Sequence, residues 1–281
     1  MGALSFLARR FVAGETADAA IACGRKLAAR RIQATFDLLG EDVRDAEAAR
    51  RLARANQDLL RRIPSEVERN VSIKLTNLGL QVSEGLCLEL AAGVLEVARE
   101  VDGFVRIDME GSAHTQQTLD VFRKLRESHD NVGIVLQAYL FRTREDVQQA
   151  VARGDHVRLC KGAYQEPASI AWTDMKQIRE SFRESARLLI DKGRRPAIAT
   201  HDETLLRDVV EYARERGVAS DRFELQMLLG LRRSRWDELV RAGHAVRVYV
   251  PYGTHWIPYF YRRLRERREN VLFVLRNLFR R

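Results

Sequence analysis

The sequence lacks the features of several protein classes, beginning with cysteine-rich ones. Its only three cysteines are Cys23, Cys87 and Cys160, and no CxxC or Cys/His ligand spacing is present. This pattern argues against a disulfide framework and against a zinc site, and it favours a reducing cytoplasm. Five prolines and 17 glycines leave no room for a long disordered or low-complexity stretch.

Long hydrophobic runs are missing as well. No apolar stretch approaches the ~20 residues that a membrane-crossing helix needs. The first residues, MGALSFLARRFVAGE, lack the long apolar core and the small-residue cleavage site of a secretory signal. A chain of 281 residues that is 46% hydrophobic and 31% charged is typical of one soluble domain, and we expect it in the cytoplasm.

Acidic residues are outnumbered, which gives a net charge of +9 and raises the question of a nucleic-acid-binding module. Most of the basic residues alternate with acids at helical spacing, as in residues 41–55, which is typical of a solvated helix face. Only the tail from Tyr261 to Arg281 is densely basic. The sequence shows no basic stripe with interleaved aromatics, so we expect no nucleic-acid partner.

Short apolar, β-prone runs recur along the chain and are separated by amphipathic helical sequence. This alternation is typical of parallel strands buried on both faces, and eight such units predict a (βα)8 TIM-type barrel. We expect residues 1–32 to form an N-terminal helical segment and residues 33–281 to form the barrel. The eight runs are ATFDLLG, VSIKLTNLG, FVRIDMEG, VGIVLQAYL, HVRLCKGAY, PAIATHD, FELQMLLG and AVRVYVPYG.

Polar side chains stand at or near the end of nearly every run, where barrel enzymes place their active groups. A barrel that served stability alone would not need them, because burying unpaired polar groups costs free energy. These residues are Lys74, Asp108, Gln137, Arg158, Lys161, Thr200, His201, Gln226 and Tyr249.

Lys74 lies inside the apolar run VSIKL, and its role is open from the residues alone. It could line the barrel in a pair with a carboxylate, for which Asp108 is the predicted partner, with Glu110 on the same face of that strand. It could instead face a ligand, or act as the Schiff-base nucleophile of an aldolase.

Two loop motifs suit an anionic ligand without proving one. In RLCKGAY, Arg158 and Lys161 are three residues apart, and Gly162 and Ala163 allow close approach of the backbone. THD, from Thr200 to Asp202, opens a predicted helix. A helix N-terminus attracts anions, but Thr and Asp are also ordinary capping residues.

After the last run, YFYRRLRE places Tyr259, Arg262, Arg263 and Glu266 on one helix face. A pair of guanidinium groups beside an aromatic ring is suited to bidentate recognition of a carboxylate. The alternative is a plain surface cluster of arginines. The histidines show no spacing that would predict a metal site.

These motifs, taken in order, resemble the proline dehydrogenase family in its short monofunctional bacterial form. The resemblance runs from about Phe11 to Asn270, and KGAY together with the terminal YxxRR is its most specific part. It implies FAD as cofactor, L-proline as substrate and a last helix that lies over the barrel mouth. Gln165 departs from the pattern, since relatives often carry an aromatic there.

The resemblance also implies a role for each matching residue. Arg158 would lie near the flavin N5 and Asp108 would complete the polar end of the substrate pocket. The proline carboxylate would be held by Arg262, Arg263 and Lys74, and the ring would be walled by Tyr164, Leu228, Tyr249 and Tyr259. Met109 and Gln137 would line the isoalloxazine, and the rest of FAD would be held by Lys161, Gly162, Ala163, Thr200, His201 and Gln226.

The reaction implied is hydride transfer from C5 of L-proline to the flavin, which gives 1-pyrroline-5-carboxylate in the first step of proline catabolism to glutamate. The family's usual electron acceptor, a membrane quinone, implies peripheral contact with the inner face of a membrane. The tail NVLFVLRNLFRR has an apolar face flanked by arginines and could either close the barrel or touch that surface. A homo-oligomer is also compatible with the resemblance.

Overall fold

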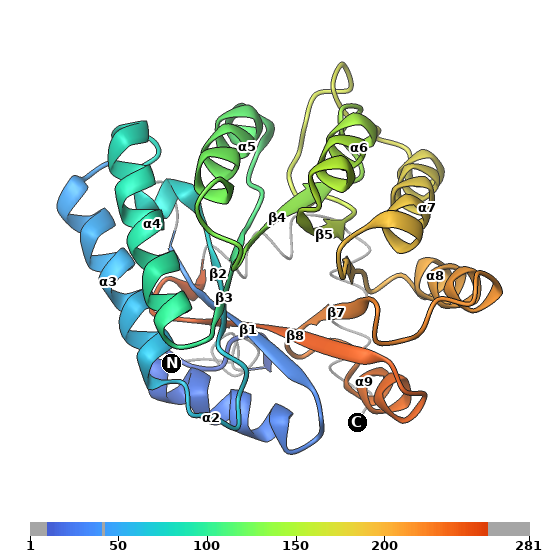
Figure 1. Ribbon diagram of the computed structural model, residues 1–281, viewed down its shortest axis with the longest axis horizontal. Coiled ribbons are helices and arrows are strands. Elements are labelled where there is room, and N and C mark those ends of the chain that lie inside the picture. Colours follow the sequence, from blue (N-terminus) through green and yellow to red (C-terminus); the bar gives the residue numbers. More distant parts are fainter. Residues whose placement is uncertain (1–9, 41–42, 258–281) are drawn as a thin grey trace.

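The structure is a computed structural model that describes residues 10–40 and 43–257. In these ranges eight parallel strands close into a barrel, each paired with its neighbours in chain order and β8 paired with β1 (Figure 1). Each predicted run overlaps one strand, and the strands β1 and β2 begin one residue before their runs, so the predicted TIM-type barrel is confirmed. The strands are β1 (Gln33–Leu38), β2 (Asn70–Ile73), β3 (Phe104–Ile107), β4 (Val132–Gln137), β5 (His156–Cys160), β6 (Ala197–Ala199), β7 (Glu224–Leu228) and β8 (Ala245–Tyr252).

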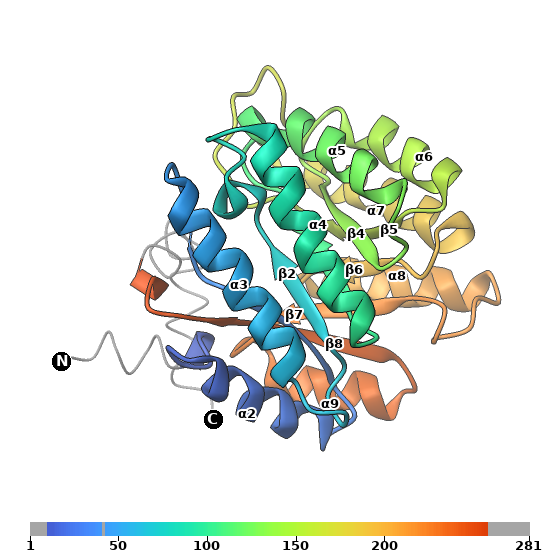
Figure 2. The same cartoon turned by 60° about the vertical axis from the view of Figure 1, so that its left-hand side comes forward.

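Helices follow the strands and form the outer layer of the barrel (Figure 2). Several begin at an aspartate that caps them: Asp45 accepts a hydrogen bond from the N–H of Ala48 at 2.8 Å at the start of α3. The connecting helices are α3 (Ala46–Arg62), α4 (Glu84–Glu100), α5 (Ser112–Arg126), α6 (Thr143–Arg153), α7 (Met175–Lys192), α8 (Glu203–Glu215) and α9 (Arg233–Arg241), with a short 3-10 helix, η1 (Leu75–Leu78), before α4.

Among the described residues, helix α2 (Ala17–Ala28) precedes β1 and completes the wall of the barrel. It packs against β1 and β8, where a regular barrel has the helix that follows its last strand. Its buried Ile21 and Leu27 belong to the main hydrophobic core. Helical structure within residues 1–32 is therefore confirmed for α2, and the division into two parts stays a prediction. The helix predicted over the barrel mouth lies outside the described residues.

The interior near the amino ends of the strands is filled by charged side chains instead of apolar ones. Arg247 of β8 lies 3.0 Å from a carboxylate oxygen of Glu224 on β7 and 2.9 Å from one of Glu68. It also donates to Gln33 Oε1 at 3.0 Å and to the carbonyl of Ala34 at 2.9 Å. These contacts use the whole guanidinium fork, which makes burial of the charge tolerable.

Arg106 of β3 lies in the same part of the interior, and its guanidinium occupies space that only a glycine at position 133 leaves open. Its Nη1 donates to the carbonyl of His156 at 2.6 Å. A Cβ added to Gly133 of β4 would lie 2.3 Å from that Nη1, so any larger residue would displace the guanidinium.

We predict that Glu224→Gln destabilises the protein and makes its free energy of unfolding less dependent on pH in the acid range. Burial alone would raise the pKa of Glu224, but Arg247 lowers it to about 2. A lowered carboxyl pKa contributes stability that is complete above the ordinary value of about 4.3 and is lost as the pH falls towards 2. At neutral pH the loss should be about 3 kcal/mol, because Arg247 keeps Glu68 as a partner.

Urea denaturation measured across this pH range tests the effect. Glu238→Gln is the matched control, since Glu238 pairs with Arg235 on the surface and its side chain is 48% exposed; little change is expected there. Equal stability of Glu224→Gln and the parent protein at neutral pH would contradict the prediction.

Candidate active site

Near the carboxyl ends of the strands, three of the predicted site residues meet across the barrel interior. Arg158 of β5 donates through Nη1 to Asp108 Oδ1 at 2.8 Å. The hydroxyl of Tyr249 on β8 donates to Asp108 Oδ2 at 2.7 Å. Asp108 directly follows β3, which pairs with neither β5 nor β8, so these contacts span the interior. Asp108 thus accepts from both partners and fixes their relative positions.

The guanidinium of Arg158 is almost fully buried, with 5% of the residue exposed. Both Nη atoms lie 3.2 Å from Ser72 Oγ, and the guanidinium carbon lies 5.5 Å from the centre of the Tyr249 ring. Its Nε has no hydrogen-bond partner within the described residues. A buried donor without an acceptor costs free energy, which is tolerated where function requires it.

Lys74 has a different partner from the one predicted. Its Nζ lies 2.7 Å from Oδ1 of Asp37, and the two side chains are 7% and 1% exposed. The predicted pairing with Asp108 is therefore wrong, because Asp108 is occupied by Arg158 and Tyr249. Asp37 was missed although it lies in the run ATFDLLG; its period-two alternation with Thr35 could have placed it on the interior face.

This pairing decides the chemistry open to Lys74. Burial alone would lower its pKa, but Asp37 and Asp108 together raise the pKa above the ordinary value for lysine. The side chain is therefore an ammonium ion, which has no lone pair to attack a carbonyl. This disfavours the Schiff-base aldolase and favours a cation that faces an anionic ligand.

The loop after β3 is held by polar contacts with neighbouring loops. Glu110 accepts from the backbone N–H of Thr76 at 3.2 Å and from its hydroxyl at 2.6 Å. Gln137, at the end of β4, donates its amide to the carbonyl of Glu110 at 2.9 Å. Met109 lies between Asp108 and Glu110 and is 6% exposed. Both residues predicted to line the flavin, Met109 and Gln137, therefore stand at the ends of adjacent strands.

The KGAY loop after β5 comes close to an aromatic ring. Gly162 has φ +115°, and a Cβ added to it would lie 1.9 Å from Cδ1 of Tyr139. The N–H of Tyr139 donates to the carbonyl of Lys161 at 2.9 Å, so the start of this loop is fixed against the loop after β4. Ala163 and Tyr164 follow and are partly exposed at the barrel mouth.

Lys161 reaches the start of α8. Its Nζ lies 3.2 Å from Asp202 Oδ2, and Arg179 Nε lies 2.8 Å from the same oxygen. Burial would raise the pKa of Asp202, but Arg179 and Lys161 lower it below the usual range. Asp202 also caps α8 by accepting from the N–H of Thr204 at 3.2 Å. The capping interpretation of THD is confirmed for Asp202.

The remaining predicted residues fall into two positions. Thr200 accepts from the N–H of Asp202 at 3.1 Å, and His201 accepts through Nε2 from the N–H of Leu228 at 3.1 Å. The predicted residues Thr200, His201 and Leu228 therefore lie next to one another at the ends of β6 and β7. Gln226 lies deeper, and its amide donates to Glu224 of the charged cluster around Arg247. Tyr259, Arg262 and Arg263 lie outside the described residues.

The residues at this end of the barrel fit an anionic dinucleotide such as FAD. Gly162 opens the backbone at a point that a Cβ would fill, Arg158 and Lys161 supply cations, and the N-terminus of α8 lies beside Lys161. The donor set is one of cations, amides and backbone N–H groups, which suits phosphate and flavin oxygens better than a metal. Within the described residues no group of histidine, cysteine and carboxylate side chains has the arrangement of a metal site.

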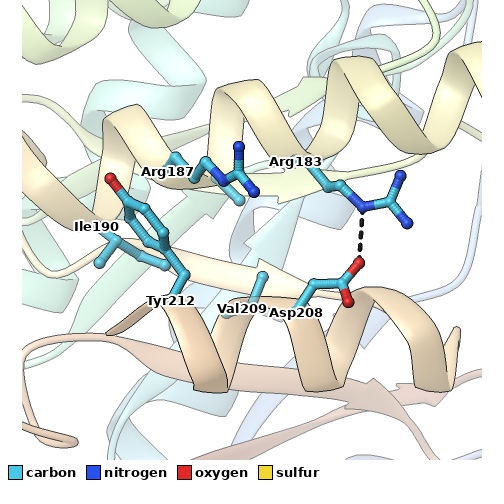
Figure 3. Close-up of a pocket in the computed structure, with 7 residues that line it drawn as sticks. Arg183, Arg187, Ile190, Asp208, Val209 and Tyr212 are labelled. Carbon is cyan, nitrogen blue, oxygen red and sulfur yellow. Dashed lines mark hydrogen bonds and ion pairs between the residues drawn. The ribbon is translucent and has the colours of Figure 1, made fainter. Parts of the chain in front are cut away.

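A separate hollow lies on the outer surface between α7 and α8 (Figure 3). Its side chains include Arg183 and Asp208, which point toward each other and are joined by a 2.6 Å hydrogen bond, and Tyr212. The volume of about 10 Å³ corresponds to about one water molecule. This hollow is too small for a metabolite and belongs to helix packing.

Comparisons with known proteins agree with this geometry. A family model described as proline dehydrogenase matches residues 20–276. The chain belongs to the proline dehydrogenase family. It is 37% identical over 272 residues to proline dehydrogenase 1 of Bacillus subtilis strain 168, covering 96% of this chain and 90% of that one. It is 35% identical over 281 residues to the proline dehydrogenase of Deinococcus radiodurans, covering 97% and 90%.

A solved structure is similar throughout the barrel. Proline utilization A from Bdellovibrio bacteriovorus, inactivated by N-propargylglycine, superposes with a TM-score of 0.86 at 25% identity. The alignment covers 93% of this chain and 32% of that protein, so the chain spans about a third of its length.

Family membership gives the activity and the cofactor. The chain is an FAD-dependent oxidoreductase, and oxidation of proline is the first step of proline catabolism. The lysine aldolase is not favoured. In the described part of the chain, no helix has both the length and the apolar character needed to cross a membrane.

We predict that Gly162→Ala yields protein with little bound flavin. The added methyl group would overlap the Tyr139 ring, and a positive φ costs a non-glycine residue about 1–2 kcal/mol. The flavin content per protein, measured by absorbance after purification, reports the effect. Gly154→Ala is the control, because Gly154 also has positive φ but nothing lies within 4 Å of its added Cβ. Full flavin occupancy in Gly162→Ala would count against a close-packed cofactor loop.

Proposed function

We propose that the network of Arg158, Asp108 and Tyr249, together with Lys74, is the reacting end of a pocket for L-proline. The supporting observation is that two buried cations, each paired with a carboxylate, lie in the barrel near the carboxyl ends of the strands. Arg158 is proposed to lie near the flavin N5, and Asp108 orients Arg158 and Tyr249. A guanidinium there would favour the negative charge that develops as the flavin is reduced.

The substrate carboxylate is proposed to bind Arg262 and Arg263, with Lys74 as a third cation. The sequence supports this by placing the two arginines on one helix face with Tyr259. Although burial alone would lower the pKa of Lys74, Asp37 and Asp108 raise it, so this side chain is charged throughout the ordinary pH range. The methylenes of the proline ring need apolar contacts, which we assign to the side chains of Tyr164, Leu228, Tyr249 and Tyr259.

The cofactor is proposed to rest on residues from β3 to β7. Met109 and Gln137 line the isoalloxazine, and Lys161, Gly162, Ala163, Thr200 and His201 hold the rest of FAD. Gln226 has the weakest support, since its amide is engaged by Glu224. When bound, FAD supplies the acceptor for the hydride that leaves C5 of proline to give 1-pyrroline-5-carboxylate.

The protein's own part in the reaction is orientation and control of protonation. Holding the carboxylate fixes C5 relative to the cofactor, which removes most of the entropy cost of the reaction. The amine must be neutral before C5 can give up a hydride. A pocket with little water and two nearby cations favours loss of the proton from the proline ammonium, because both burial and like charge disfavour that cation.

We also propose a cytoplasmic protein that passes electrons to a membrane quinone through peripheral contact and that forms a homo-oligomer. The basic, partly apolar tail sequence supports contact with an anionic surface.

The first experiment is anaerobic titration of the purified holoprotein with L-proline while the visible flavin bands are recorded. We expect the bands to bleach with L-proline and to remain with D-proline, because a fixed carboxylate presents only one face of the ring to the cofactor. If the flavin bands bleach with neither enantiomer, L-proline is refuted as the substrate. A protein that binds no FAD but is trapped at Lys74 by borohydride would revive the aldolase.

A second experiment tests the carboxylate clamp. Arg262→Met and Arg263→Met should each raise the KM for L-proline roughly 30-fold or more, since loss of one partner of a desolvated charge pair costs about 2–5 kcal/mol. Arg268→Met is the matched control, because helical spacing puts it on the face opposite Tyr259. Unchanged proline affinity in both variants would disprove the clamp.

A further inference from the structure

Glu166 joins two active-site loops that are far apart in the sequence. It belongs to the loop after β5, two residues beyond Tyr164. Its Oε1 accepts from the backbone N–H of Ser112 at 2.7 Å, and its Oε2 accepts from the hydroxyl of Ser112. The Tyr139 hydroxyl lies 3.4 Å from the same Oε1. One carboxylate therefore links the loops that follow β3, β4 and β5.

The contact replaces a cap that the helix itself lacks. Ser112 is the first residue of α5, and the residue before it, Gly111, has no side chain to accept the free N–H groups. A carboxylate at a helix N-terminus is favoured both by hydrogen bonding and by the helix dipole. The sequence brings this carboxylate from 54 residues further along the chain, in place of a local aspartate or serine.

The same contact lies beside the side chain of Tyr164. A Cβ added to Gly111 would lie 3.6 Å from Glu166 Oε1 and 3.9 Å from Cδ1 of Tyr164, so both side chains rest against Gly111. Burial would lower the pKa of Lys74, while Asp37, Asp108 and, to a smaller extent, Tyr164 raise that pKa. Tyr164 is therefore a neighbour of the Glu166–Ser112 contact, and it also acts electrostatically on Lys74 of the proposed substrate pocket.

The other end of the loop has its own support. Lys161 is fixed by the N–H of Tyr139 and by Asp202, and Gly162 packs on the Tyr139 ring. Without Glu166, the segment Tyr164–Pro167 would lose its contact with α5 while Lys161 and Gly162 kept theirs. Loss of Glu166 should therefore affect the substrate side more than the cofactor side.

We propose that Glu166 is a positioning residue that holds Tyr164 against bound proline by fastening the loop after β5 to the N-terminus of α5. The inference rests on the proposed function, because it assigns Tyr164 to the wall of the proline pocket. Glu166 itself touches neither substrate nor cofactor. Its effect on proline affinity passes through Tyr164.

The test compares Glu166→Ala with the parent holoenzyme. We expect the KM for L-proline to rise about tenfold, kcat to change less than about threefold and the FAD affinity of the apoprotein to change less than about twofold. The affinity for cyclopentanecarboxylate, which lacks the amine and is not oxidised, should fall in parallel, as measured by perturbation of the flavin spectrum. Glu166→Gln should largely restore affinity, since its amide can accept from the N–H and donate to the hydroxyl of Ser112.

A double-mutant cycle separates positioning from simple capping. In a Tyr164→Ala background, Glu166→Ala should change KM less than about twofold, because contacts that act through the same residue are not additive. Asp174→Ala is the matched control: Asp174 caps α7 by accepting from the N–H groups of Lys176 and Gln177. It should lower the melting temperature and leave KM unchanged.

Three results would overturn the proposal: an unchanged KM in Glu166→Ala, additive effects with Tyr164→Ala, or an equal rise of KM in Asp174→Ala. If Glu166→Ala does not fold, Ser112→Ala, which removes the hydroxyl that donates to Glu166, gives the same comparison with a smaller loss. A parent enzyme whose flavin does not bleach with L-proline would instead refute the proposed function, so the two failures are distinguishable.

Discussion

The structure depends on the pairing of charges inside the barrel. A (βα)8 barrel is ordinarily filled by layers of branched apolar side chains, but here Arg247, Arg158 and Lys74 are buried in its interior and each has a carboxylate within 3.0 Å. An isolated charge there would cost several kcal/mol, so each cation requires a partner and that partner is then committed. This requirement decides which side chains remain available to a ligand.

The pairs divide the barrel into two regions with different tasks. Around Arg247, every nitrogen of the guanidinium is engaged by protein oxygens, so that cluster contributes to the fold. Arg158 and Lys74, near the carboxyl ends of the strands, are each paired with one carboxylate, and this pairing raises the pKa of Lys74. The raised pKa of Lys74 disfavours covalent imine chemistry and favours electrostatic recognition, which agrees with membership of a flavoenzyme family in which the cofactor carries the redox chemistry.

The loops at the mouth are ordered by polar contacts between one another, because they lie beyond the strand ladders. Glu110 is fixed by Thr76, Lys161 by Asp202, and Glu166 by Ser112. Each contact pairs a side chain of one loop with a loop or helix start that follows a different strand. The site is thus built from loops that brace each other on a rigid barrel, which gives the small spread of positions that orientation of a substrate requires.

The sequence by itself determined the eight strands, the helices between them and the presence of polar residues at the strand ends. These features follow from hydrophobic periodicity and from turn-forming residues between the elements, which are both local properties of the chain. It also carried the resemblance that named FAD and proline. Tertiary structure alone decided the pairing of Lys74 with Asp37 and not Asp108, and of Glu166 with Ser112. These choices depend on which strands and loops the closed barrel brings together, and the distance in space between two such residues is not encoded in their separation along the chain.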